Sequence, residues 1–153
     1  MNTREDQFAA KSAARLAVVQ ALYQMEVSGA SNEDVAEDFR AGRLPRDDAG
    51  PVDAEPDPDL FSTLVENAVN RQTTIDRAIA RRLSTGWRLE RIDSVARAIL
   101  RAGVTELERT ETPTPIVIDE YVEIAKAFFD GPEPGFINAT LDACAKDVRA
   151  DVR

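Results

Sequence analysis

The chain has 153 residues, the length of one ordinary domain, and its composition of 43% hydrophobic and 31% charged residues is typical of a globular protein. It contains no histidine and a single cysteine, Cys144, which excludes histidine-based acid–base catalysis, Cys/His zinc sites and an internal disulfide bond. No apolar run approaches the roughly 18 residues of a membrane span, and the polar start is unlike a signal peptide, so we expect one cytoplasmic domain over residues 1–153 with no membrane contact.

The formal net charge of −9 argues at first against a nucleic-acid partner, because phosphate binding depends on Lys and Arg. The acidity is, however, concentrated. Residues 43–59 hold four of the eight prolines, six acidic side chains and almost no large apolar side chain. Such a segment buries too little to offset its ordering entropy, so we predict a mobile acidic loop at 43–59. The folded remainder is then near neutral and can carry a basic face.

Apolar residues recur with helical spacing in the first half of the chain, and no segment shows the alternation of a strand. Leu16, Val19 and Tyr23 follow a three-then-four spacing that predicts a helix over 5–28, with Gly29 as its stop.

Two further helices are expected on either side of the acidic loop. Ser31 precedes an acidic first turn and predicts a short helix that ends near Gly42, with Val35 facing inward. A long helical stretch then covers 60–83, with a break allowed at 72–74.

The second half of the chain predicts three more helices. One runs over 93–107 with Asp93 as its N-cap. The next covers 115–129, with Thr114 as a candidate cap, and its wide apolar face predicts a central helix that is packed on two sides.

The last helix follows a break at 130–135 and shows Ile137, Leu141, Cys144 and Val148 at helical spacing. The sequence therefore predicts an all-α fold of six or seven helices with a buried, inert Cys144.

Enzyme motifs are absent: the sequence holds no glycine-rich phosphate loop, no GxSxG and no HExxH. Asp119, Glu120 and Glu123 lie in the first turns of a predicted helix, where the helix dipole accounts for them, and no second carboxylate motif completes a metal site. We therefore expect no enzymatic activity, no cofactor and no metal. The alternative, an enzyme that uses these carboxylates, would be supported if the protein showed metal-dependent turnover that amide substitutions of the carboxylates abolished.

Arginines gather around the sole tryptophan, Trp87: Arg81, Arg82, Arg88, Arg91, Arg97 and Arg101. Arg4, Lys11 and Arg15 add basic groups to the first helix. Basic side chains near an exposed aromatic ring are typical of single-stranded RNA binding, and a solvated helix surface is the alternative.

Three other side chains fit the helical pattern less simply. Phe136 and Asn138 flank Ile137, so they point partly sideways if Ile137 faces the core. Phe136 can equally staple the helix entry. Tyr23 completes an apolar stripe, yet its hydroxyl needs a polar or solvated end.

Several blocks together resemble the bacterial transcription antitermination factor NusB family, over nearly the whole chain. They are AVVQALY at 17–23, VARAILR at 95–101 with TEL at 105–107, PIVIDE at 115–120 with EIAK at 123–126, and FINATLD at 136–142.

The resemblance implies an all-helical protein of two packed sub-bundles that is not an enzyme. It also implies binding of boxA-type single-stranded leader RNA, including that of ribosomal RNA operons, together with a NusE-type ribosomal protein in an RNA polymerase antitermination complex. The RNA contacts that it implies fall on Lys11, Arg15, Tyr23, Arg97, Arg101, Phe136 and Asn138, and Arg4 joins them as a further cation of the basic first helix.

Two departures from the family pattern lower the expected RNA affinity. The first helix has Lys11 and Arg15 where many members carry an arginine-rich run, and Gly135 stands where a lysine often precedes the phenylalanine. Because each lost phosphate contact weakens binding, we expect weak RNA binding by the chain alone and a basic partner protein that supplies positive charge.

The alternative is a non-catalytic helical interaction module, because a similar domain forms the N-terminal accessory part of RNA cytosine methyltransferases. We expect no methyltransferase domain after Arg153. The sequence is compatible with a monomer or a homodimer.

Overall fold

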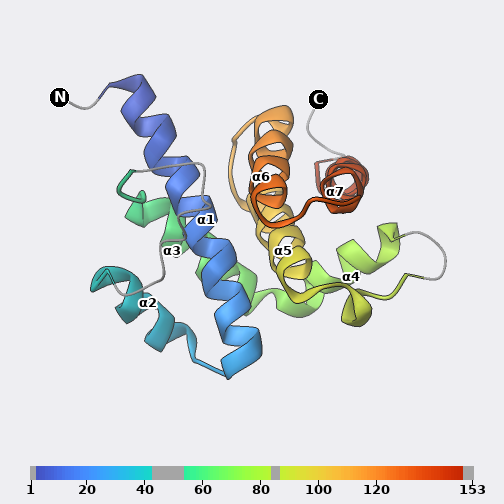
Figure 1. Cartoon of the computed structure of the whole chain (residues 1–153), viewed down its shortest axis with the longest axis horizontal. Helices are drawn as coiled ribbons and strands as arrows, with labels where there is room; N and C mark the ends of the chain where they lie inside the picture. The colour runs from blue at the N-terminus through green and yellow to red at the C-terminus, as the bar shows by residue number, and fades with distance from the viewer. Residues whose placement is uncertain (1–2, 43–53, 84–86, 150–153) are drawn as a thin grey trace.

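The computed structural model describes residues 3–42, 54–83 and 87–149. These residues form seven α-helices and one 3-10 turn, with no strand among them, which confirms the predicted all-α fold (Figure 1). The elements are α1 (Arg4–Ser28), α2 (Asn32–Arg40), α3 (Pro58–Asn70), α4 (Gln72–Arg82), η1 (Leu89–Arg91), α5 (Ser94–Arg109), α6 (Thr114–Phe128) and α7 (Glu133–Val148). None of these helices combines the length and the apolar character needed to cross a bilayer.

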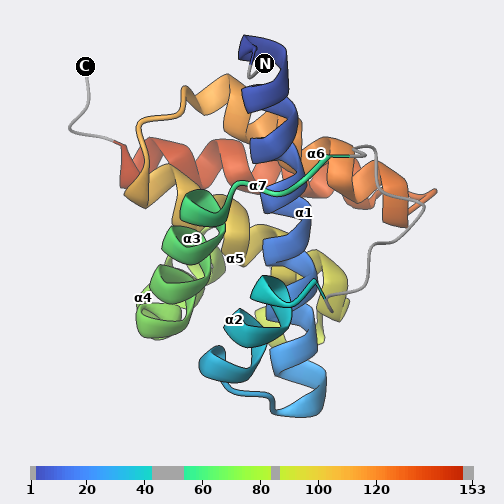
Figure 2. The same cartoon turned by 90° about the vertical axis from the view of Figure 1, so that its left-hand side faces the viewer.

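The helices form two sub-bundles that share α5. Helices α1, α2 and α3 pack together on one side, and α4, α6 and α7 lie on the other, while α5 contacts both groups (Figure 1). Turning the molecule by 90° brings α1, α2 and α3 to the front, with α7 crossing behind α1 (Figure 2). This confirms the two-sub-bundle arrangement that the family resemblance implied.

Helix α5, and not α6, is the central element, which corrects the prediction for residues 115–129. Ten of the 16 residues of α5 are buried, compared with five of the 15 residues of α6. The physical reason is side-chain size: Ala96, Ala98, Ala102 and Gly103 let neighbouring helices approach α5 from several directions. A wide apolar face shows that a helix is buried, but it does not show which helix lies in the middle.

Local signals account for several of the helix ends. Thr3 and Asp6 form a capping box at the start of α1, with both bonds at 3.0 Å, and Gly29 ends the helix with a φ of +74°. Ser31 caps α2, as its position suggested, and Asp93 caps α5 by accepting the Val95 amide at 2.8 Å.

Two boundary predictions were wrong in detail. The stretch over 60–83 is two helices that meet at Arg71, one residue before the expected break. Thr114 does not cap α6: Pro113 occupies the N-cap position, no side chain bonds the first amides, and the Thr114 hydroxyl accepts from Arg149 instead, at 2.9 Å. The Thr114 hydroxyl therefore bonds Arg149, which is distant in sequence, and does not cap the helix as the local pattern had predicted.

The other two corrections concern segments rich in proline. Helix α7 begins at Glu133, inside the expected break at 130–135, because a proline in the first turn has no amide bond to lose. Of the predicted acidic loop, residues 43–53 lie outside the described part of the chain. Asp57 caps α3, which already includes residues 58 and 59, so the loop ends earlier than predicted.

The contact between α5 and α7 depends on a glycine. A methyl group added at Gly103 would lie 2.8 Å from Cδ2 of Leu141 and 3.0 Å from its Cδ1. Leu141 is itself fully buried, so it has little room to move aside.

Gly103→Ala is therefore expected to lower the free energy of unfolding by about 1–3 kcal/mol, the usual cost of overpacking a core. Gly135→Ala is the matched control, since Gly135 is also helical and a methyl group there meets nothing within 4 Å. The control is expected to leave stability unchanged or raise it by up to about 1 kcal/mol. Urea denaturation measures both, and equal stability of the two variants would contradict the close α5–α7 contact.

Candidate nucleic-acid interface

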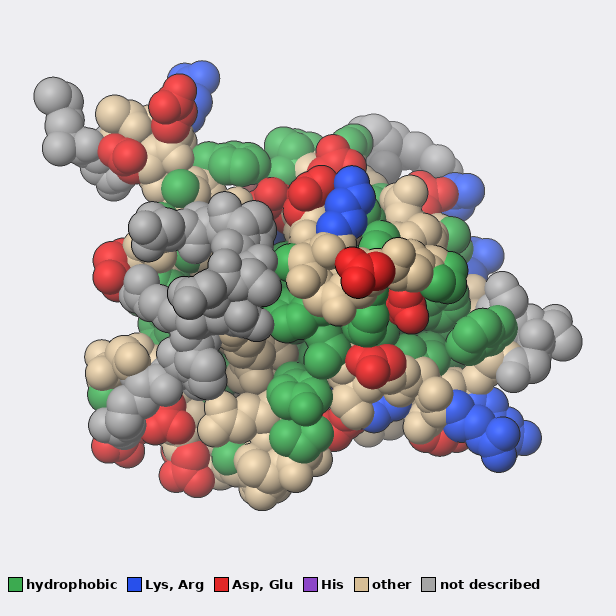
Figure 3. Space-filling view, in the orientation of Figure 1, with side chains coloured by type: hydrophobic (Ala, Val, Ile, Leu, Met, Phe, Trp, Pro, Cys, Tyr) green, Lys and Arg blue, Asp and Glu red, His purple; other side chains and the backbone are tan. Residues whose placement is uncertain are grey.

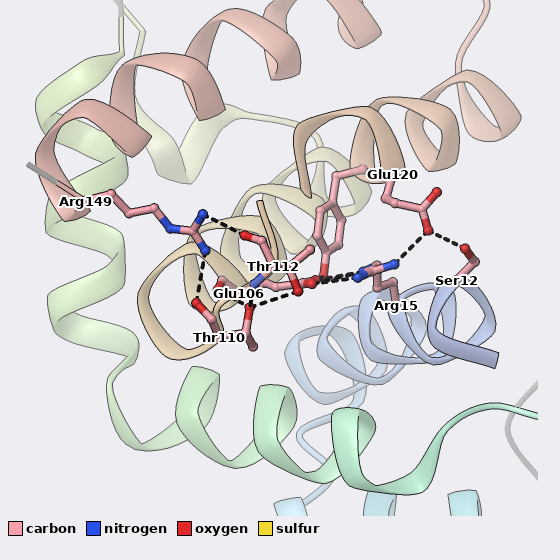
Figure 4. A network of polar contacts seen from close by, with 8 residues as sticks. Ser12, Arg15, Glu106, Thr110, Thr112, Glu120 and Arg149 are labelled. Atoms are coloured by element: carbon pink, nitrogen blue, oxygen red, sulfur yellow. Dashed lines mark hydrogen bonds and ion pairs between the residues drawn. The ribbon is translucent and has the colours of Figure 1, made fainter. Parts of the chain in front are cut away.

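A buried ion-pair network joins the two sub-bundles beneath the predicted RNA-binding helix. Arg15 of α1 is 2% exposed and forms two parallel bonds with Glu106 of α5, Nε to Oε1 at 2.9 Å and Nη2 to Oε2 at 2.8 Å (Figure 4). Its Nη1 donates to Glu120 of α6 at 2.7 Å. The Tyr121 hydroxyl donates to Glu106 at 2.9 Å, and the Ser12 hydroxyl donates to Glu120. All three guanidinium nitrogens of Arg15 are thus bonded inside the protein.

The electrostatics keep Arg15 charged and Tyr121 neutral. Burial alone would lower the pKa of Arg15, but the bonds and charge of Glu106 raise that pKa above its usual value. Burial, followed by the negative charge of Glu106, raises the pKa of Tyr121 well above its usual value, so Tyr121 remains a neutral donor. The direct RNA contact of Arg15 stays a prediction, and the structure shows a side chain engaged in holding α1 to α5 and α6.

Removing one member of this pair leaves the other as a buried, unpaired charge. Arg15→Ala and Glu106→Ala are each expected to lower the free energy of unfolding by about 3–5 kcal/mol. Lys126→Ala, which breaks an exposed pair with Glu123 on α6, is the control and should change stability little. Denaturation curves for the three variants measure the difference, and a loss in Arg15→Ala no larger than in the control would show that the buried pair is not needed.

Arg97 and Arg101 lie one turn apart on α5, and both are paired with carboxylates. Both arginines bond the same carboxylate, Glu26 at the end of α1, at 2.7 Å and 3.0 Å. Arg101 also bonds Asp76 of α4 at 2.8 Å. Their side chains are only 11% and 13% exposed. Tertiary contacts thus neutralise much of the positive charge of Arg97 and Arg101, and RNA contacts by these two residues stay a prediction.

Arg97 has a second role in the connection before α5. Its Nη1 donates to the carbonyl oxygens of Leu89 and Ile92, both at 2.8 Å. Leu89 and Ile92 are buried at 7% exposure each, so the 3-10 turn is held from its backbone and from its side chains. Arg97 therefore positions the segment that follows Trp87.

The hydrogen bond from Arg97 is the largest influence on Glu26 and holds its pKa below the usual value. Partial burial raises this pKa, and the hydrogen bond from Arg101 lowers it further. A carboxylate with a lowered folded pKa stabilises the fold above its unfolded pKa, and this stabilisation is lost as pH falls through the folded value.

We therefore expect the free energy of unfolding to fall as pH is lowered from about 5 to about 3, and to fall less in Glu26→Gln than in the parent chain. Denaturation at several pH values measures this dependence. Identical pH dependence of the two proteins would show that Glu26 does not contribute.

The remaining cations and the tyrosine that were predicted on α1 are solvent-exposed. Arg4 and Lys11 lie on the outer face of its N-terminal half, and Tyr23, which is 38% exposed, lies near its C-terminal end. Arg4 and Tyr23 are about 28 Å apart along the helix at 1.5 Å per residue. The predicted residues of α1 therefore span nearly its whole length and do not form one compact cluster.

The last two predicted residues lie at the start of α7. Asn138 is exposed, and Phe136 is partly buried against the core. The Phe136 ring also contacts Trp87, with ring centroids 5.4 Å apart and planes tilted by 34°. Trp87 is 56% exposed. Sequence analysis had placed Trp87 among arginines but had not paired it with Phe136, because nearly 50 residues separate them.

Sequence reasoning also missed a clamp at the other end of α7. Arg149 donates to the carbonyl oxygens of Leu107, Thr110 and Thr112 at 2.8, 3.0 and 2.7 Å. In Figure 4, Arg149 reaches the connection between α5 and α6 from one side of Glu106, and Arg15 reaches Glu106 from the other. Only the fold brings these residues together, and no local motif marks them.

Cys144 is buried, as predicted. Burial, together with the nearby Asp147 charge, raises the pKa of its thiol to about 11. At neutral pH the group is therefore a thiol rather than a nucleophilic thiolate. The described residues also contain no group of three or more side chains arranged to hold a metal ion.

The two helical sub-bundles define an all-α fold, and comparisons with known proteins show which family shares it. The sequence pattern of the NusB family matches residues 12–146. The transcription antitermination protein NusB of Caulobacter vibrioides is 55% identical over 140 residues, covering 91% of this chain and 94% of that protein. The chain belongs to the NusB family.

Solved structures show the same fold. T. maritima NusB matches with a TM-score of 0.73 and 28% identity, over 90% of this chain and 91% of that one. A NusB solved with NusE and double-stranded RNA matches with a TM-score of 0.72 and 24% identity, over 95% and 99% of the two chains. At that identity the second likeness concerns the fold alone.

Proposed function

We propose that this chain is a non-catalytic, RNA-binding antitermination factor. It binds a boxA-type single-stranded leader RNA, including that of ribosomal RNA operons, together with a NusE-type ribosomal protein, within an RNA polymerase antitermination complex. The observation that carries the proposal is family membership over residues 12–146, with 55% identity to a transcription antitermination protein.

The predicted residues divide into two roles under this proposal. Exposed Arg4 and Lys11 contact phosphates, while Tyr23, Phe136 and Asn138 offer rings and an amide to bases. The guanidinium groups of Arg15, Arg97 and Arg101 are bonded to carboxylates, so these residues act mainly by fixing the helices that carry the exposed groups.

The same ion pairs support the expectation that a protein partner strengthens RNA binding. Each arginine whose charge is matched by a carboxylate contributes little net attraction to phosphate, and the chain as a whole carries a net charge of −9. The chain alone should therefore bind RNA weakly, and a basic ribosomal protein bound beside the RNA should strengthen binding.

Fluorescence anisotropy of a labelled boxA-type RNA tests the proposal. The boxA-type RNA and a scrambled control are titrated with the protein, with and without the NusE-type protein, over a range of salt. Selective binding that tightens with the partner supports antitermination. Binding of the ribosomal protein with no RNA binding would favour the interaction-module alternative instead.

Arg4→Ala and Lys11→Ala are each expected to weaken RNA binding and to reduce the slope of log affinity against log salt by about 0.7, the value for one phosphate contact with a single strand. Lys146→Ala is the control, because Lys146 is equally cationic, is 72% exposed and lies near the far end of α7. Anisotropy at several salt concentrations measures the slope. Equal salt slopes for all three variants would show that the N-terminal half of α1 does not contact the RNA phosphates.

A further inference from the structure

Trp87 presents most of an indole ring to solvent without being loosely attached. The side chain is 56% exposed, and one of its neighbours is the Phe136 ring at 5.4 Å. Phe136 belongs to the rigid first turn of α7 and packs against the core. The indole therefore contacts a ring that packs against the core, while 56% of Trp87 stays exposed.

The backbone that follows Trp87 is anchored. Two residues further on, the 3-10 turn is anchored by buried Leu89 and Ile92, whose carbonyl oxygens both accept from Arg97 at 2.8 Å. A ring that is exposed but held in place loses little conformational entropy when a ligand covers it. This combination suits a binding surface.

The charges that lie near Trp87 along the chain indicate the kind of ligand. Arg88 and Arg91 lie on the same connection and Arg81 lies on the last turn of α4; all three are exposed, with Glu90 as an opposing charge. The three arginines differ from Arg97 and Arg101 in being solvent-facing. Figure 3 shows basic side chains gathered at this right-hand edge of the molecule, close to exposed hydrophobic side chains.

An aromatic ring beside exposed cations matches the chemistry of an unpaired nucleotide, which has a flat base and a negative phosphate. We propose that Trp87, supported by Phe136, stacks on one unpaired base of single-stranded RNA, with Arg88 and Arg91 near the adjoining phosphates. This inference rests on the proposed function and adds a residue that receives a base. Because every base has a stacking face, Trp87 contributes affinity more than sequence choice.

The chain provides its own probe, because Trp87 is its only tryptophan. Titration of the full chain with an unlabelled boxA-type RNA should quench the tryptophan fluorescence, and the midpoint should match the affinity measured by anisotropy of the labelled RNA. A mixed sequence of the same length should quench at higher concentration but to a similar extent.

Variants separate stacking from structural support. Trp87→Ala is expected to weaken RNA binding roughly tenfold, while Trp87→Phe, which keeps a ring, loses less. Neither change should alter the salt slope, because no charge is removed, whereas Arg88→Ala should reduce that slope by about 0.7. Val27→Ala is the control, since Val27 has the same 56% exposure on α1, and circular dichroism confirms that each variant is folded.

Three outcomes would overturn the inference. If RNA binds but tryptophan fluorescence stays constant and Trp87→Ala binds as tightly as the parent chain, stacking is absent and the proposed function still stands. If RNA fails to bind with or without the basic partner, both proposals fall. If fluorescence responds only to the partner protein and Trp87→Ala loses that partner, Trp87 belongs to a protein interface.

Discussion

The buried pair between Arg15 and Glu106 is the interaction on which the arrangement of the helices depends. An arginine at 2% exposure requires a full set of acceptors, and the Glu106 and Glu120 carboxylates provide them from two different helices. Because a buried charge cannot tolerate a shift of its partners, the pair fixes α1 against α5 and α6. This contact on the buried side of α1 therefore determines which side chains of α1 face solvent.

The same principle acts at the other end of α1, where Glu26 bonds both Arg97 and Arg101. These pairs are partly exposed and individually weaker than the buried one, since solvent screens them. Together with the Arg15 network, these pairs use four carboxylates to hold arginines in place: Glu26, Asp76, Glu106 and Glu120. The positive charge that Arg15, Arg97 and Arg101 leave for an external anion is correspondingly small, which is consistent with the basic partner protein in the proposed function.

Sequence analysis succeeded where the determinants were local. The 5–28 helix, the Ser31 and Asp93 caps and the apolar stripe through Cys144 were predicted within a few residues, because spacing and capping act over one or two turns. The family resemblance added the two sub-bundles. Thr114 shows the limit of such reasoning, because its hydroxyl bonds Arg149, which lies 35 residues away, and does not cap its own helix.

For the candidate site too, some features followed from the sequence and others only from the tertiary structure. The sequence by itself determined that the chain is helical, that it belongs with the NusB proteins and that Arg4, Lys11 and Trp87 lie near other basic residues along the chain. Only the tertiary structure decided that Arg15 is buried and that Trp87 rests on Phe136. The reason is physical: whether a charge or ring faces water depends on partners brought together by packing, and helical periodicity specifies a face without specifying what covers it.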